Sequence, residues 1–213
     1  LLREHLCHTA ARAAQFGSAF GAERQAHLLG MWHDLGKCLP AFQRHIRGDV
    51  QRVDHSIVGA ALAFQKHNRY GLPLAFAIAG HHAGIANLRV SGPDMPAPLL
   101  ERLQQSRSSL EEVLRTLTED FTKPSLPELP DALLSSNEAG VETASILRRI
   151  EFWTRFLFSA LVDADWLDTE VFFTPEVGQR REGYESLVVL KERLDKYLEK
   201  KQVGLSEIQR AMP

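Results

Sequence analysis

The stretch Met31-Trp32-His33-Asp34-Leu35-Gly36-Lys37 decides how the rest of the chain is interpreted. It ends a predicted apolar helix over residues 22–35 with an adjacent histidine and aspartate, followed by a glycine and a lysine. Gly36 suits the left-handed position that follows many helix ends. The carbonyl groups of a last helical turn carry partial negative charge, so they favour a nearby cation. A single histidine–aspartate pair is common and usually structural, so a cation site is predicted only if other ligands join it.

Residues of the same types recur as Asp54-His55-Ser56, His81-His82 and Asp163-Ala164-Asp165, and His5 lies in the first apolar segment. Buried ionisable groups need partners or a metal. Histidine and carboxylate donors suit Mn, Fe, Co, Ni or Zn rather than calcium. They outnumber the four ligands of a structural zinc. Two metals about 3.5–4 Å apart that share a carboxylate fit better, and this arrangement serves in-line displacement at phosphorus.

The order of residues after the pair supports the same chemistry. Neighbours on a helix differ in direction by about 100°, so His33 and Asp34 can face two metals, or Asp34 can bridge them. Lys37 follows the glycine and can reach a phosphate oxygen, where it would offset developing negative charge.

The composition limits the class of protein. The chain has 213 residues, 44% of them apolar, which is enough for a sizeable core. Its net charge of -2 argues against a generally basic nucleic-acid coat. Cys7 and Cys38 form no CxxC pair and are expected as small buried apolar residues; with no signal peptide they predict a reducing, cytoplasmic compartment. No apolar run approaches the roughly 18 residues that span a membrane, and the initial Leu favours a piece of a longer protein.

Apolar residues recur at helical spacing along most of the chain, with almost no alternating strand pattern. The sequence therefore predicts an all-α fold in a single domain. Asp54 is a candidate N-cap, and Trp166 is expected in the core. Two stretches at 85–97 and 120–138 are predicted to be long surface loops. The predicted helices cover residues 2–16, 22–35, 40–46, 54–67, 74–82, 98–119, 139–168 and 183–202.

The motifs together resemble a known family. His33-Asp34-Leu35-Gly36-Lys37 resembles the signature of the HD superfamily of metal-dependent phosphohydrolases. The HD nuclease domain of type I CRISPR interference, which accompanies a superfamily-2 helicase, is a narrower resemblance over about residues 2–170. It is carried by Asp54-His55-Ser56 with Val58-Gly59-Ala60, His81-His82-Ala83-Gly84, Leu161-Val162-Asp163-Ala164-Asp165-Trp166, and His5-Leu6 with Thr9-Ala10. Residues 171–213 would then be a C-terminal helix and a possible linker to a helicase.

This resemblance implies a helical HD-superfamily bundle with a central metal site. It implies metal-dependent endo- or exonucleolytic cleavage of single-stranded DNA in antiviral defence, by hydroxide attack at two divalent transition metals, Mn, Fe, Co or Ni ahead of Mg or Zn. Asp34 and Lys37 would be catalytic, with Lys37 beside the scissile phosphate. One metal would take His5, His33, Asp34 and Asp165; the other would take Asp34 as a bridge with His55, His81 and His82.

The resemblance also implies partners and leaves one register open. The family's last aspartate stands in an Ala-Asp pair before a bulky residue, which favours Asp165 over Asp163. The implied partners are single-stranded DNA, a helicase domain in cis or in trans and a CRISPR RNA-guided surveillance complex, with no membrane. Helicase motifs are absent from this chain, so strand loading needs a further segment or partner.

Two other functions remain open from the sequence. One is an HD-type phosphohydrolase of a nucleotide or cyclic dinucleotide, with a closed pocket. The other is a non-catalytic, metal-stabilised recruitment domain that docks through the 183–202 helix and the 120–138 loop. Between 37 and 69 the chain has six basic residues (Lys37, Arg44, Arg47, Arg52, Lys66 and Arg69) against Asp49 and Asp54. These form either a patch that tracks a DNA backbone or a solvated helical face.

Overall fold

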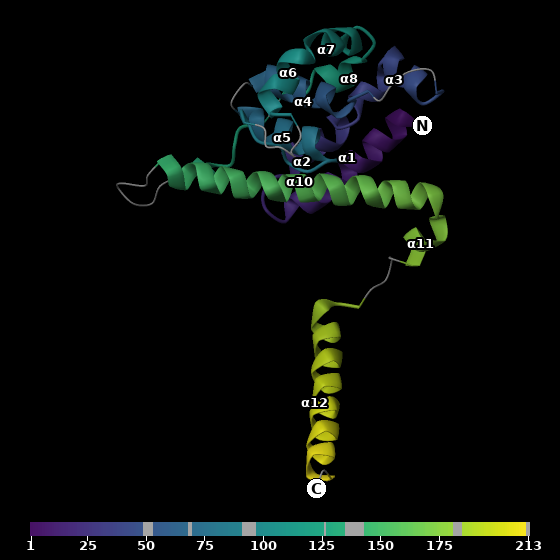
Figure 1. Ribbon diagram of the computed structural model, residues 1–213, viewed down its shortest axis with the longest axis vertical. Helices are drawn as coiled ribbons and strands as arrows, with labels where there is room; N and C mark the ends of the chain where they lie inside the picture. Colours follow the sequence, from purple (N-terminus) through teal and green to yellow (C-terminus); the bar gives the residue numbers. More distant parts are fainter. Residues whose placement is uncertain are drawn as a thin grey trace. The chain divides into compact units, whose positions relative to one another are not determined.

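The apolar spacing of the sequence produces helices throughout the computed structural model (Figure 1). The structure describes residues 1–48, 53–67, 70–90, 97–125, 127–134, 143–180 and 185–211, and it gives only the backbone for 67, 179–180 and 202–211. Within these ranges there is no strand, so the all-α prediction is confirmed. The chain divides into two compact units, Leu1–Thr169 and Glu170–Pro213.

A tight hairpin of α1 (Leu2–Ser18) and α2 (Glu23–Trp32) opens the first unit. Gly21 makes the turn between them with a positive φ of 69°, which favours glycine. Gly30 lets the two helices cross closely, because an added Cβ there would lie 2.7 Å from the Thr9 carbonyl carbon. The hairpin therefore brings His5, on α1, to the end of α2.

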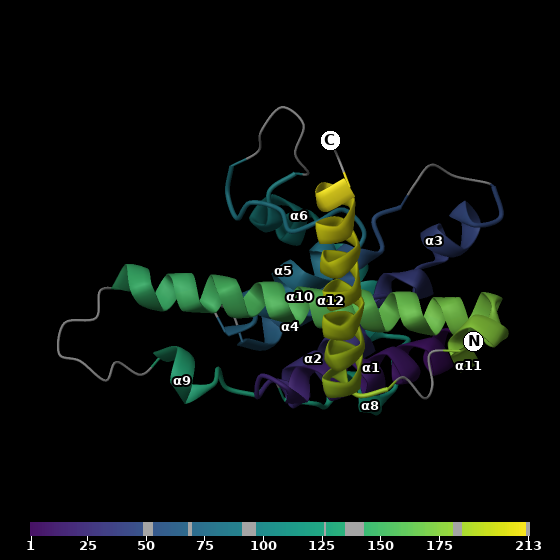
Figure 2. The ribbon, with the colours of Figure 1, turned by 90° about the horizontal axis from the view of Figure 1, so that it is seen from below.

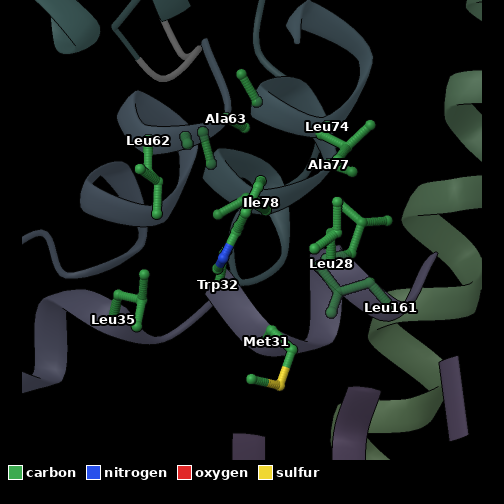
Figure 3. Packing of buried hydrophobic residues seen from close by; sticks show 14 of the residues in the cluster. Leu28, Met31, Trp32, Leu35, Leu62, Ala63, Leu74, Ala77, Ile78 and Leu161 are labelled. Carbon is green, nitrogen blue, oxygen red and sulfur yellow. The ribbon is translucent and has the colours of Figure 1, made fainter. Parts of the chain in front are cut away.

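The next pair is α4 (Ser56–His67) with α5 (Leu72–Gly80), which packs on α2 around a buried tryptophan. Trp32 is fully buried, and its Nε1 donates a hydrogen bond to the Phe121 carbonyl oxygen at 3.1 Å. Figure 3 shows Trp32 beside Ile78 of α5, and Leu28 beside Leu161 of a later helix. This apolar core fixes the ends of α2 and α5, where the predicted ligands lie.

Shorter helices cover the rest of this core, where the predicted helix over 98–119 is broken at Ser106. Ser106 is buried, and its hydroxyl donates to the Leu103 carbonyl oxygen, a local bond that competes with helix continuation. The predicted loop over 120–138 is partly helical, and its residues 126 and 135–138, like 91–96 of the other loop, lie outside the described residues. The short helices are η1 (Leu35–Cys38), α3 (Pro40–His45), α6 (Leu99–Gln105), α7 (Arg107–Leu114), α8 (Glu119–Thr122) and α9 (Asp131–Leu134).

The long helix α10 (Thr143–Phe173) crosses the shorter ones and extends past the predicted end at 168 (Figures 1 and 2). Its buried stripe includes Leu157, Leu161 and Ala164. The expectation that Trp166 lies in the core is wrong, since this side chain is 72% exposed. Trp166 is two residues beyond Ala164, which turns it about 200° around the helix, away from the stripe.

The second unit holds the end of α10, α11 (Pro175–Arg180) and α12 (Leu187–Ala211). The predicted helix at 183–202 is therefore present with later bounds. Apolar side chains along α12, such as Leu187 and Leu194, are exposed, and Lys191 and Asp195 form an ion pair one turn apart at 2.6 Å. None of the described helices has the length and apolar character needed to cross a bilayer.

Candidate metal centre

All seven residues predicted as ligands lie in one cluster at the ends of α2 and α5, the start of α4 and the faces of α1 and α10. Their donor atoms form three overlapping groups, within each of which every atom lies less than 4.8 Å from the others. The groups are Asp34 with His55, His81 and His82; His5 with His33 and Asp34; and His33 with His81 and Asp165. The structure therefore brings the seven predicted residues together, and Asp34, His33 and His81 each join two groups.

The turn that carries His33 and Asp34 differs from its prediction. Helix α2 ends at Trp32, and the 3-10 helix η1 follows from Leu35. Gly36 is not in the left-handed region that the sequence suggested. Its small size serves a close approach instead, because an added Cβ would lie 2.7 Å from the Cα of His55 and nearer still to its carbonyl oxygen. This contact places the start of α4 against the His33-Asp34 turn.

His33 and His81 are oriented in the same way. Each follows a helix end, and each donates its Nδ1 hydrogen to the carbonyl oxygen three residues earlier, Gly30 at 2.9 Å and Ile78 at 2.7 Å. Ligating histidines characteristically donate their second ring nitrogen to such an acceptor, which fixes the tautomer. Both Nε2 atoms are therefore free of protons when the rings are neutral, and both face Asp34.

Asp34 stands at the middle of the cluster with a side chain only 1% exposed. Its Oδ2 lies 3.3 Å from His33 Nε2 and 3.6 Å from His5 Nε2. Its Oδ1 lies 3.2 Å from His55 Nε2 and 3.6 Å from His81 Nε2. No hydrogen bond of ordinary geometry reaches either oxygen or His81 Nε2, although all three atoms are buried; Oδ2 is in ion-pair contact with the Lys37 ammonium. Converging donor atoms without hydrogen bonds fit a divalent metal site, and the two oxygens face different histidine pairs.

The His5 half of the cluster also holds Asp165. His5 Nε2 lies 3.3 Å from Asp165 Oδ1 and 3.3 Å from His33 Nε2. Asp163 is exposed, so Asp165 is the aspartate that faces the cluster. The sequence favoured Asp165 over Asp163. The helical period could also have excluded Asp163, because residues two positions apart lie on different sides of a helix and Asp163 is two positions from both Leu161 and Asp165.

Sequence reasoning missed Asp168. Its Oδ2 accepts the Nδ1 hydrogen of His5 at 2.7 Å, and its Oδ1 lies 3.3 Å from His8 Nδ1. This bond directs His5 Nε2 toward Asp34, as a carboxylate behind a ligating histidine does. The available signal was spacing: Asp168 is three residues after Asp165 and so shares its helix face.

The other half of the cluster is formed by three histidine rings. His55 Nε2 and His82 Nε2 lie 2.9 Å apart, and the ring centroids of His81 and His82 are 3.8 Å apart. Burial, followed by the charges of His81 and His55, lowers the pKa of His82 to about 4. His82 is therefore a neutral imidazole at neutral pH, the form that binds a metal.

The carboxylates hold protons on the histidines of the His5 half. The nearby carboxylate of Asp165, followed by that of Asp34, raises the pKa of His5 to about 10. Burial opposes charge on His33, but Asp165 and Asp34 outweigh it and raise the pKa of His33 to about 9. Burial also opposes charge on Asp34, yet the surrounding histidines hold the pKa of Asp34 far below its usual range. The pocket thus favours positive charge, which a divalent cation supplies when it displaces these protons.

Lys37 and the rest of the basic stretch occupy different environments. The Lys37 ammonium is in ion-pair contact with Asp34 Oδ2, and its side chain is 30% exposed. Lys66 is engaged elsewhere, donating to the Thr122 carbonyl oxygen at 2.5 Å, while Arg52 and Arg69 lie outside the described residues. Cys7 is exposed, so its expected burial is wrong.

Comparison with known proteins agrees with this geometry. The family model described as "Cas3, HD domain" matches residues 1–168, which include every residue of the cluster. A search of curated proteins found no match.

Proposed function

The chain belongs to the family of Cas3 HD domains, which are CRISPR-associated metal-dependent nucleases, and we propose that it cleaves single-stranded DNA at a two-metal site during type I CRISPR interference. The observation that carries this proposal is the placement of Asp34. Its two buried carboxylate oxygens face separate pairs of histidine nitrogens, as a carboxylate that bridges two cations does. A single structural metal needs no such division.

The proposed ligand sets follow the two sides of Asp34. His5, His33 and Asp165 would hold one metal on the Oδ2 side. His55, His81 and His82 would hold the other on the Oδ1 side. Imidazole donors suit transition metals rather than Mg, and we propose Mn, Fe, Co or Ni ahead of Zn because the resemblance to the HD nuclease family implies that order.

The chain's own groups divide the catalytic work. Divalent cations at such a site supply a hydroxide nucleophile at neutral pH and stabilise negative charge on the phosphate. Asp34 would bridge them and fix their separation. Lys37, at the exposed edge, would leave Asp34 and turn its ammonium to an oxygen of the scissile phosphate. His5, oriented by Asp168, would keep its Nε2 directed into the site.

The biological setting is also part of the proposal. Residues 1–213 would act as one HD nuclease domain, with 171–213 leading toward a helicase in cis or serving one in trans. A CRISPR RNA-guided surveillance complex would deliver the target, and the helicase would present it as a single strand. No membrane is involved in this scheme.

A digestion assay on metal-stripped protein tests the activity. The protein is reloaded separately with Mn, Fe, Co or Ni and incubated with circular single-stranded DNA, end-labelled oligonucleotides and duplex plasmid. We expect cleavage of the single strands that is lost in Asp34→Ala and retained in Asp163→Asn, a change on the exposed side of the same helix as Asp165. Cutting of the circle identifies endonucleolytic cleavage.

Two results would refute the proposal. The absence of metal-dependent strand cleavage in every loaded form, or equal cleavage by Asp34→Ala, would exclude the nuclease. Hydrolysis of nucleotides or cyclic dinucleotides without strand cleavage would identify the small-molecule phosphohydrolase instead.

A further inference from the structure

Arg102 of α6 joins the two turns that carry His55 and His81-His82. Its guanidinium donates to Asp54 Oδ2 from Nε at 3.1 Å and from Nη2 at 2.8 Å. It also donates to the Ala79 carbonyl oxygen from Nη1 and Nη2, both at 3.2 Å. Nη2 lies a further 3.2 Å from Ser56 Oγ. One side chain that is only 13% exposed therefore connects α6 to two other segments of the chain.

The acceptors directly flank the proposed ligands. Asp54 and Ser56 are the neighbours of His55 on either side, and Ala79 is two residues before His81. Ser56 Oγ is within hydrogen-bond distance of both Asp54 Oδ1, at 2.9 Å, and the Ala79 carbonyl oxygen, at 3.3 Å. The same network thus holds the start of α4 to the end of α5, where a last-turn carbonyl has no partner along the helix.

The network contains one positive and one negative side chain, Arg102 and Asp54. Arg102 Nη2 and Asp54 Oδ2 form an ion pair at 2.8 Å, so the largely buried guanidinium has a carboxylate as its counter-charge. A planar guanidinium presents its donors in a rigid fork, so it fixes the separation of the groups that it binds.

We propose that Arg102 is a positioning residue for the His55, His81 and His82 half of the metal centre, an inference that rests on the proposed two-metal function. It acts through the backbone, because its bonds go to residues beside the ligands. The spacing that it sets is the one that leaves His55 and His82 Nε2 2.9 Å apart and places His55 and His81 on Oδ1 of Asp34. Its bonds do not reach His5, Asp165 or Asp168.

Manganese titration of the metal-stripped full chain tests this role. Calorimetry gives the number and affinity of the sites, and electron paramagnetic resonance reports whether two bound Mn ions are coupled. In Arg102→Gln we expect one site to weaken about tenfold to hundredfold, the range typical for lost outer partners of metal ligands, with the coupled signal lost and the other site unchanged. Arg102→Lys keeps the charge without the fork and should weaken the same site.

Arg107→Gln is the matched control. Arg107 is the same residue type at the start of α7, and its contact is an exposed ion pair with Glu111 at 3.4 Å. It should bind both metals as the unaltered protein does. Ser56→Ala removes one acceptor oxygen, Asp54→Asn replaces one with an amide nitrogen, and both variants keep Arg102. Both should weaken the same site, so they test the role of Arg102 even if Arg102→Gln fails to fold.

The outcomes distinguish failure of the positioning role of Arg102 from failure of the proposed two-metal function. Failure of the unaltered chain to bind two Mn ions overturns the two-metal proposal itself. Two sites in the unaltered chain with undiminished affinity in the Arg102 variants overturn only the positioning role. Equal weakening of both sites also overturns it, because that pattern marks a general loss of structure.

Discussion

Substitution of Gly36 by alanine should damage one half of the metal centre and spare the other. The added Cβ would lie 2.7 Å from the Cα of His55, whereas ordinary van der Waals contact begins at 3.4 Å. The His55 backbone must therefore withdraw by at least about 0.7 Å, the difference of these distances, and further at its carbonyl oxygen. His55 Nε2 would then leave its place 3.2 Å from Asp34 Oδ1.

The expected magnitudes follow from this displacement. Overpacking of a close contact typically costs about 1–3 kcal/mol of folding free energy. Misplacement of a reacting group by about 1 Å can cost roughly a hundredfold in rate, so DNA cleavage by Gly36→Ala should fall by about that factor. Mn affinity at the His55 side should fall tenfold or more, while the His5 side, which does not contact this glycine, should keep its affinity.

Gly21→Ala supplies a control of comparable stability. Gly21 has a φ of 69° and open space around its Cα, so alanine there costs about 1–2 kcal/mol of left-handed strain without touching the cluster. Thermal unfolding followed by circular dichroism compares the two variants, and calorimetry with Mn counts their sites. If Gly36→Ala binds two Mn ions as tightly as Gly21→Ala does, the argument from the close approach is wrong.

Three further outcomes are expected. Asp168→Asn should weaken Mn binding at the His5 side about tenfold by calorimetry, since the bond that orients His5 is impaired, while Asp163→Asn should have no effect. Metal-free protein should lose thermal stability as pH rises from about 7 to 10, because the pKa values of His5 and His33 are raised to about 10 and about 9 in the folded state. The stability that these two protonated histidines give is complete below pH 6.5 and is lost as the pH passes through the folded-state pKa values. His5→Gln should flatten the dependence of stability on pH, and an unchanged dependence would contradict this explanation. Removal of metal by a chelator should lower the unfolding free energy by about 2.7 kcal/mol for each site that is occupied at a hundredfold excess of metal over Kd. Chemical denaturation measures this change, and equal midpoints with and without metal would show that no metal binds the native state.

The sequence was sufficient for those parts of the molecule that local patterns encode. The helical period predicted α1, α4 and α10 within a few residues, and the all-α class is confirmed. Histidines and aspartates at the ends of apolar segments or within them predicted the seven residues that the structure brings into one cluster. These signals are local because a helix end places its last side chains by backbone geometry alone.

The supporting residues could not be found in this way because their contacts are distant in sequence. His5 and Asp168 are separated by 163 positions, and Arg102 and Asp54 by 48. Nothing in the segment around Arg102 distinguishes it from the solvated arginines of the same charged stretch. Its role is visible only after α4, α5 and α6 have packed, because the acceptors then come from two different turns.

Three glycines show how the fold sets the precision of the cluster. Gly30 admits the backbone of α1, Gly59 that of Trp32, and Gly36 that of His55; an added Cβ at each would lie 2.7 Å from a backbone carbon of its neighbour. Gly30 and Trp32 precede the His33-Asp34 turn in the chain, and Gly36 follows it, so the three contacts flank this turn. Hydrophobic period specifies which face of a helix is buried, but it does not specify how closely two backbones approach. In this chain that closeness decides whether histidines from separate helices come within reach of one aspartate.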